Sequence, residues 1–174
     1  MTTKQIATSA LFLSLLIAAG VIAVPLPGLP VPVLVQNMVV MLTAGLLDRK
    51  SGLVTISTFL ALVALGLPLL AGGRGGAAVF VGPSAGFLLG YWLSPLVLGS
   101  WPKHSLLRAV CGYVVMALLI DGLGGLSMGI SAGGHLLSGF AMALTFVPLD
   151  LAKALMAAWL TVRLQAGVRL TQKN

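Results

Sequence analysis

Long apolar segments that carry almost no charge dominate the sequence and restrict the folds open to it. Hydrophobic residues make up 59% of the 174 positions and charged residues only 7%, whereas a soluble domain carries about 25% charged residues. A soluble core of this length has no room for so much apolar surface, so the surrounding solvent must be lipid. We therefore predict an all-α integral membrane protein, a compact helix bundle in one domain, residues 1–174.

Hydropathy over a window of about 19 residues predicts six transmembrane helices. Their ranges are 6–24, 33–47, 52–70, 79–98, 106–126 and 148–166. The apolar stretch 135–146 is too short to span a bilayer, so we expect a surface or re-entrant helix there, or a kink at Pro148 if it joins the sixth span. The first span is longer than the apolar region of a signal peptide, about 7–15 residues, and we interpret it as a retained helix.

The basic residues separate to the two sides of this predicted bundle. Eight fall on one side: Lys4, Arg49, Lys50, Lys103, Arg108, Arg163, Arg169 and Lys173. Arg74 lies in an opposite loop, and Lys153 lies inside the sixth span. Because loops rich in Lys and Arg stay in the cytoplasm, we predict that both termini are cytoplasmic. The net charge of +7 is scattered over the ends of apolar runs, so it indicates membrane topology and no nucleic-acid partner.

Polar residues from four segments lie at the same, outer level of this topology. They are Gln36, Asn37, Arg74, Asp121, Asp150 and Lys153. Such groups are costly in lipid and should face each other or a cavity. Their convergence at one depth predicts a small-molecule site open to the outside.

Each of these residues also has a purely structural interpretation. Asp150 and Lys153 lie three residues apart, hence on one helical face, where they can form an ion pair or place the carboxylate at a helix start. Asp121 can bond to another helix or pair with Lys153, and the two amides of the second span can hold helices together. Arg74 can be a solvated loop charge.

No catalytic, nucleotide-binding or metal-binding motif accompanies these residues. The chain lacks G-x-x-x-x-G-K-[ST], H-E-x-x-H and G-x-S-x-G. Residues 73–78 match G-x-G-x-x-A but follow an apolar helix, so their glycines are expected to allow a tight turn and close approach to a ligand. His135 has no second metal ligand nearby, His104 is expected in a loop, and Cys111 has no cysteine partner. We therefore expect no enzyme, no metal and no cofactor.

Small residues recur at a four-residue period in the first span, at Ala10, Ser14 and Ala18. A face of this kind permits close packing of two helices. It serves either packing within this bundle or docking of another membrane protein.

Four elements, in order along the chain, resemble those of a known family. Residues 30–37 (PVPVLVQN) are similar to its P-V-P-x-x-x-Q element, and residues 66–76 (GLPLLAGGRGG) to its G-L-P-V-F-x-G-G-x-G-G loop. Residues 82–87 (GPSAGF) resemble G-P-T/S-G-G-Y/F, and residues 148–153 (PLDLAK) resemble P-G-D-x-x-K. Over nearly its whole length the chain thus resembles BioY, the biotin-specific S component of energy-coupling factor (ECF) transporters.

This resemblance implies six helices in a bacterial or archaeal cytoplasmic (inner) membrane and an outward-facing biotin site. It also implies two kinds of partner: a transmembrane coupling protein and a pair of ATP-binding cassette (ABC) ATPases. The coupling protein would dock on Ala10, Ser14 and Ala18. Leu149 stands where the family has glycine. Leu88 stands where some relatives carry a basic residue, so Arg74 is the natural substitute for a contact to the biotin carboxylate. The residues predicted to form the site are Asp150, Lys153, Arg74, Gln36, Asn37, Gly73, Gly75, Phe80, Ser84, Phe87, Tyr91 and Asp121.

The chemistry of biotin matches these residue types. Asp150 can accept a hydrogen bond from a ureido N–H, Lys153 can donate to the ureido carbonyl, and Arg74 can bind the carboxylate. The aromatic residues Phe80, Phe87 and Tyr91 would serve either as apolar walls or in helix packing. The alternatives are an S component for another small vitamin and a structural membrane protein whose polar residues only join helices.

Overall fold

The computed structural model describes residues 1–21, 23–24, 33–102 and 105–171. The helices within these residues are α1 (Thr3–Gly20), α2 (Val35–Leu46), α3 (Arg49–Ala64), α4 (Ala85–Leu98), α5 (Leu106–Ser131), α6 (Leu136–Leu144) and α7 (Val147–Thr171). A short 3₁₀ helix, η1 (Ala77–Phe80), precedes α4. Two-residue strands, β1 (Ala23–Val24) and β2 (Val33–Leu34), pair antiparallel between α1 and α2.

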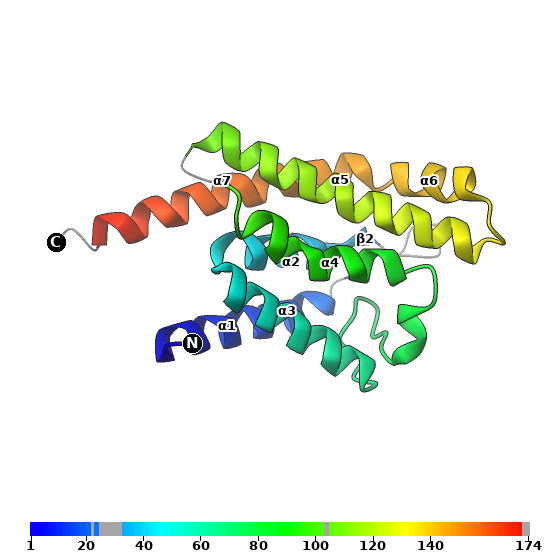
Figure 1. Ribbon diagram of the computed structural model, residues 1–174, viewed down its shortest axis with the longest axis horizontal. Coiled ribbons are helices and arrows are strands. Elements are labelled where there is room, and N and C mark those ends of the chain that lie inside the picture. Colours follow the sequence, from blue (N-terminus) through cyan, green and yellow to red (C-terminus); the bar gives the residue numbers. More distant parts are fainter. Residues whose placement is uncertain (22, 25–32, 103–104, 172–174) are drawn as a thin grey trace.

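The helices form a bundle whose long members run side by side (Figure 1). The helix α2 packs against α1, α3, α4 and α7, while α5 packs against α4, α6 and α7. Because of this central place, α2 buries eight of its 12 residues, including Gln36 and Asn37 at its start. The all-α bundle predicted from the sequence is therefore confirmed, with the short strand pair as an unpredicted addition.

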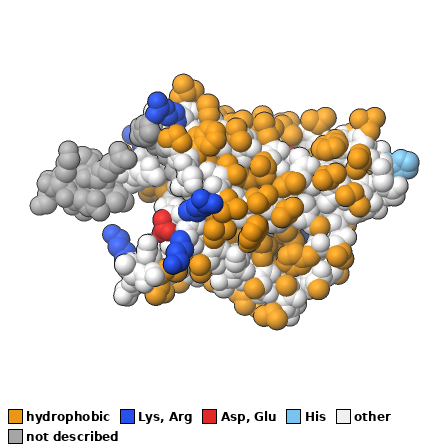
Figure 2. Space-filling model, in the orientation of Figure 1, with side chains coloured by type: hydrophobic (Ala, Val, Ile, Leu, Met, Phe, Trp, Pro, Cys, Tyr) orange, Lys and Arg blue, Asp and Glu red, His pale blue; other side chains and the backbone are white. Residues whose placement is uncertain are grey.

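Apolar side chains cover the flanks of the bundle between its two ends (Figure 2). Among the described residues, α1 and α5 are each long and apolar enough to cross a membrane, and α6 with α7 pass the same test as a pair bent by 51°. The helices α2 and α4 are apolar but shorter. The bend agrees with the kink expected near Pro148, which lies in the first turn of α7, where its missing N–H is tolerated.

Two predicted spans were wrong at the ends that face the loop between α3 and α4. The third helix stops at Ala64 instead of reaching residue 70, because Gly66 has φ +99° and Pro68 has no N–H to continue the helix. The fourth helix begins at Ala85 rather than residue 79, since the Gly82–Pro83 step separates it from η1. A hydropathy window averages over such breaks, so it drew both spans too long at these ends.

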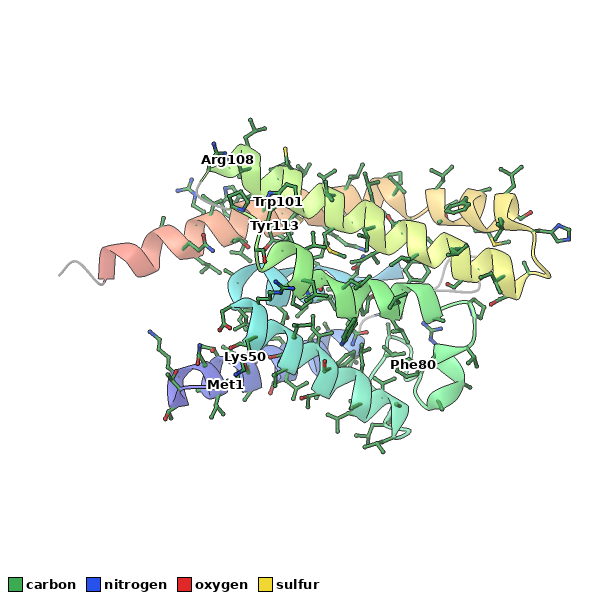
Figure 3. All side chains as sticks on the ribbon, in the orientation of Figure 1. Met1, Lys50, Phe80, Trp101, Arg108 and Tyr113 are labelled. Carbon is green, nitrogen blue, oxygen red and sulfur yellow. The ribbon has the colours of Figure 1, made fainter. Side chains whose placement is uncertain are left out.

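The Lys and Arg side chains visible in Figure 2 gather at one end of the bundle. Lys50 and Arg108 lie at this basic end with Met1, and Phe80 lies toward the opposite, loop end (Figure 3). Asp48 also lies here, as the N-cap of α3, where its carboxylate accepts hydrogen bonds from the backbone N–H and the hydroxyl of Ser51. These bonds lower the pKa of Asp48 below its ordinary value. Lys103, His104 and Lys173 lie outside the described residues.

Glycine lets α4 and α5 touch at backbone distance. A Cβ atom at Gly86 would overlap the carbonyl oxygen of Leu123, so we expect Gly86→Ala to lower the melting temperature in detergent by several degrees, as overpacking a close contact does. The control is Gly122→Ala on α5, where nothing lies within 4 Å of the added atom and alanine favours helix. Equal melting temperatures for the two variants would contradict the close approach.

Candidate ligand-binding site

An ion pair at the start of α7 is the charged centre of the candidate site. The ammonium Nζ of Lys153 lies 2.7 Å from Oδ1 of Asp150, and both side chains are largely buried. Asp150 lies in the first turn of α7, where its carboxylate is favoured by the helix dipole. The predicted common face of the two residues is confirmed, and the contact agrees with the structural interpretation as much as with the ligand-binding one.

Two buried groups from neighbouring helices lie within electrostatic reach of this pair. The charges of Asp150 and Lys153 act on the Asp121 carboxyl of α5. The charges of Asp150, Asp121 and Arg74 act on the Tyr91 hydroxyl of α4. Asp121 is 3% exposed and Tyr91 1% exposed. Polar groups of α4, α5, α7 and the loop that carries Arg74 therefore act on one another electrostatically; the predicted convergence also included the amides of α2 and stays a prediction.

Arg74 approaches the site from the loop between α3 and η1. Its Nη1 donates to Oγ of Ser84 over 2.9 Å, and its Nε donates to the carbonyl of Ala71 over 3.3 Å. Arg74 is half-buried, and burial lowers the pKa of its guanidinium while Tyr91 acts in the opposite direction; arginine nevertheless stays charged at neutral pH. Ser84, predicted to contact the ligand, thus already has a partner in Arg74, which it helps to orient.

The amides of α2 differ in how the protein uses them. Gln36 is fully buried, and its Nε2 donates to the carbonyl oxygens of Leu16, at 2.8 Å, and Leu69, at 2.9 Å. This agrees with the predicted alternative that the amide holds segments together. Asn37 is also buried, and its Oδ1 has no hydrogen-bond partner among the described residues.

Unpartnered polar atoms concentrate at the candidate site. In the part of the chain that the structure describes, six buried side-chain oxygen or nitrogen atoms lack a hydrogen-bond partner. One belongs to Ser9; the others are Oε1 of Gln36, Oδ1 of Asn37, the Tyr91 hydroxyl and both carboxylate oxygens of Asp121. Leaving a buried polar group unpaired costs about 1–3 kcal/mol. Five of these atoms lie on four predicted site residues; the Asp121 carboxyl also faces that of Asp150, and the Tyr91 hydroxyl can donate as well as accept.

The aromatic residues predicted as apolar walls separate into different surroundings. The ring of Phe87 packs edge-on against that of Phe146, with centroids 6.0 Å apart, and lies over Gly124. Phe80 on η1 lines an apolar hollow of about 550 Å³ between α3, α4 and α5. None of the charged site residues lines this hollow, so we distinguish it from the polar site.

Comparison with known proteins identifies the family. A profile of the BioY family matches residues 1–170. The chain belongs to the BioY family. It is 33% identical to the biotin transporter BioY of Lactococcus lactis subsp. cremoris, over 96% of this chain and 94% of that protein. It is also 33% identical to the biotin transporter BioY of Rhizobium etli, over 98% and 97% of the two chains.

A solved structure shares the fold of this BioY protein. It is the crystal structure of the S-component for biotin from an ECF-type ABC transporter, which superposes with a TM-score of 0.88 at 30% identity and covers 95% of each chain. The predicted membrane-protein fold is therefore confirmed, and the family is one of transporter subunits rather than enzymes. Among the described residues no three His, Cys, Asp or Glu side chains gather to hold a metal ion.

The predicted glycines of the loop act through the backbone. Gly73 has φ +71°, a conformation that residues with a side chain rarely adopt. A Cβ at Gly75 would overlap the carbonyl of Leu67. Both glycines therefore allow the tight turn that carries Arg74, and this turn needs no direct ligand contact from either of them.

Sequence reasoning missed two contacts that shape the site. Gly20 at the end of α1 lies so close to the loop that a Cβ there would overlap the carbonyl of Leu69, and Phe146 supports the ring of Phe87. The four-residue spacing of Gly82, Gly86 and Gly90 was a usable signal for the close packing of α4. No comparable signal marked Gly20, because its neighbour is a backbone group far along the chain.

The predicted docking face of α1 is open. Ala10, Ser14 and Ala18 are all exposed, while Leu16 and Ala19, on the opposite side of the helix, are buried. Ser14 Oγ donates to the carbonyl of Ala10, so its hydroxyl is satisfied within the helix. Within the described residues the small-residue stripe is therefore largely free of packing inside this bundle, with Ala10 bordering a hollow between α1 and α3.

Proposed function

We propose that this chain is the membrane subunit that captures biotin for an ECF transporter. The observation that carries the proposal is the largely buried Asp150–Lys153 ion pair, together with the buried side-chain oxygens of Gln36 and Asn37 that have no partner among the described residues. A cyclic urea offers two N–H donors and one carbonyl acceptor, which match these oxygens and the Lys153 ammonium. Membership of the BioY family supports the same ligand.

Recognition of biotin would divide between the two ends of the ligand. Asp150 accepts a hydrogen bond from one ureido N–H and Lys153 donates to the carbonyl, since both are charged and largely buried. Arg74, held by Ser84, binds the valerate carboxylate. Asp121 and Asn37 supply further acceptors, and Tyr91 and Phe87 supply apolar surface between the polar ends.

ATP-driven transport requires partners, because the sequence contains no nucleotide-binding loop. The partners are a transmembrane coupling protein and ABC ATPases, as for ECF transporters generally. The exposed stripe of Ala10, Ser14 and Ala18 on α1 is the proposed docking face for the coupling protein. Its small side chains allow a partner helix to come close.

Purification of the chain and analysis of its bound small molecules tests the ligand. We expect biotin to co-purify, detected by mass spectrometry, and added biotin to raise the melting temperature of the ligand-free protein. Displacement of biotin by a different vitamin at lower concentration would indicate another S-component ligand. A melting temperature unchanged by any vitamin would indicate a structural membrane protein.

The distribution of charge leads us to propose that both termini face the cytoplasm. Lys50 and Arg108 lie at the basic end with Met1 (Figure 3), and Lys or Arg in short loops favours the cytoplasmic side. We expect reporters fused to either terminus to be active only in the cytoplasm. A reporter inserted in the loop after Gly72 is the control and should report the outside. Activity of either terminal reporter outside the cell would overturn this orientation.

A further inference from the structure

The carboxamide of Gln36 joins three parts of the chain that are distant in sequence. It is carried by α2 and donates one hydrogen bond to Leu16 on α1 and one to Leu69 in the loop that precedes Arg74. Both partners are carbonyl oxygens, which only accept, so the two donors of the amide nitrogen must point at them. The orientation of the amide is thereby fixed by its partners.

The connection continues from Leu69 to the arginine of the site. Leu70 follows directly and forms a tight turn with Arg74, since the Leu70 N–H donates to the Arg74 carbonyl at 2.9 Å and the Arg74 N–H donates to the Leu70 carbonyl at 3.2 Å. The side chain of Arg74 then reaches Ser84 at the start of α4. Movement of the Leu69 carbonyl would therefore move the turn that carries Arg74.

Close packing reinforces this bridge on the side of α1. Gly20 in the last turn of α1 leaves space for the Leu69 carbonyl, and a Cβ there would overlap that oxygen and come within 2.9 Å of Nε2 of Gln36. The end of α1, the Gln36 amide and the loop thus form one packed unit. The exposed stripe of small residues lies on the same helix, two to ten residues before Gly20.

We infer that Gln36 is a positioning residue that fixes the Arg74 loop to α1 and couples ligand occupancy of the site to the helix that carries the docking face. The inference rests on the proposed function, since it concerns the same site. It assigns to Gln36 a role other than direct recognition: its amide nitrogen is committed to the protein, and only Oε1 remains for a ligand. Ligand contact with Arg74 would then stabilise the last turn of α1 through Leu69 and Gln36.

Hydrogen–deuterium exchange of the purified ligand-free protein tests the bridge directly. Gln36→Met keeps the length of the side chain but removes both donors, so we expect exchange in residues 66–76 and in residues 17–21 to accelerate together, by about two- to tenfold, the range for loss of a buried hydrogen bond. Thr43→Val is the matched control, because Thr43 is a buried polar residue of the same helix whose hydroxyl donates to Val39 of α2 and is not part of the bridge. It should change neither segment.

A second variant reaches the same contact from the other side. Gly20→Ala leaves Gln36 intact but displaces the Leu69 carbonyl, so it should reproduce the faster exchange in residues 66–76. In the wild type, biotin should slow exchange in both segments; in Gln36→Met it should slow exchange only in residues 66–76. Unchanged exchange in both Gln36→Met and Gly20→Ala would overturn the inference, and the ligand-free measurement stands even if biotin proves not to bind.

Discussion

Replacing Asp150 with asparagine is expected to weaken biotin binding by about 10- to 150-fold, which corresponds to a charge-assisted hydrogen bond of about 1.5–3 kcal/mol. The Asp150 carboxylate lies 2.7 Å from the Lys153 ammonium, and both side chains are largely buried. The substitution removes the charged acceptor for a ureido N–H and leaves Lys153 without its anion in a poorly solvated place, which is costly. The asparagine oxygen can still accept a hydrogen bond, so the lower part of the range applies if the amide faces the ligand.

Arg74→Ala is the comparison, and a smaller loss is expected. Arg74 sits in a loop and is only half-buried, so water and salt screen its attraction to the ligand carboxylate. Exposed ion pairs contribute about 0–1 kcal/mol, which is a loss of about fivefold or less. This loss should shrink as salt rises, whereas the loss for Asp150→Asn should not.

Calorimetric titration of both variants at low and high salt measures these differences. Lys50→Ala serves as the control for charge alone, because Lys50 lies at the basic end, away from the loop end where Phe80 lies (Figure 3), and it should bind biotin like the wild type at both salts. A larger loss for Arg74→Ala than for Asp150→Asn at both salts would show that the loop closes over the ligand and buries the arginine, and the ranking would be wrong.

The charged pair of the site was predictable because helix geometry fixes it. Residues three apart on a helix share a face, so Asp150 and Lys153 had to meet once residues 147–171 formed a helix. The approach of Asp121 was also predictable, since its depth in the fifth span matched theirs. Both inferences needed only the helix period and the order of the spans.

The role of Gln36 was not predictable in the same way. Its partners are backbone carbonyls 20 and 33 positions away in sequence, and every residue carries such a carbonyl, so no residue type marks them. The early end of α3 was different: Gly66 and Pro68 are visible in the sequence as helix-breaking residues, but a hydropathy average gives them little weight. Local breaks can therefore be recovered from sequence by attention to residue type, while long-range contacts to backbone cannot.

Placing tryptophan on the exposed stripe of α1 is expected to abolish biotin uptake while leaving biotin binding unchanged. Ala10 and Ala18 are both exposed, and the buried face of α1, which includes Leu16 and Ala19, points the other way. Ala18→Trp therefore adds bulk on the exposed side of α1. Ala10→Trp adds it at a position that also borders a hollow between α1 and α3. A helix of the coupling protein that must approach a small-residue face closely would be held away by the indole ring.

Uptake of labelled biotin by cells that express the complete transporter, together with titration of the purified subunit, separates the two effects. Leu118→Trp on α5 is the matched control: Leu118 is exposed, and α5 packs against α4, α6 and α7 rather than against α1, so equal bulk there should leave both uptake and binding normal. Loss of binding in Ala10→Trp would indicate that the ring disturbs the bundle itself. Normal uptake in both Ala10→Trp and Ala18→Trp would place the docking face elsewhere, because a close helix contact cannot accommodate a side chain of that size at either position without separating.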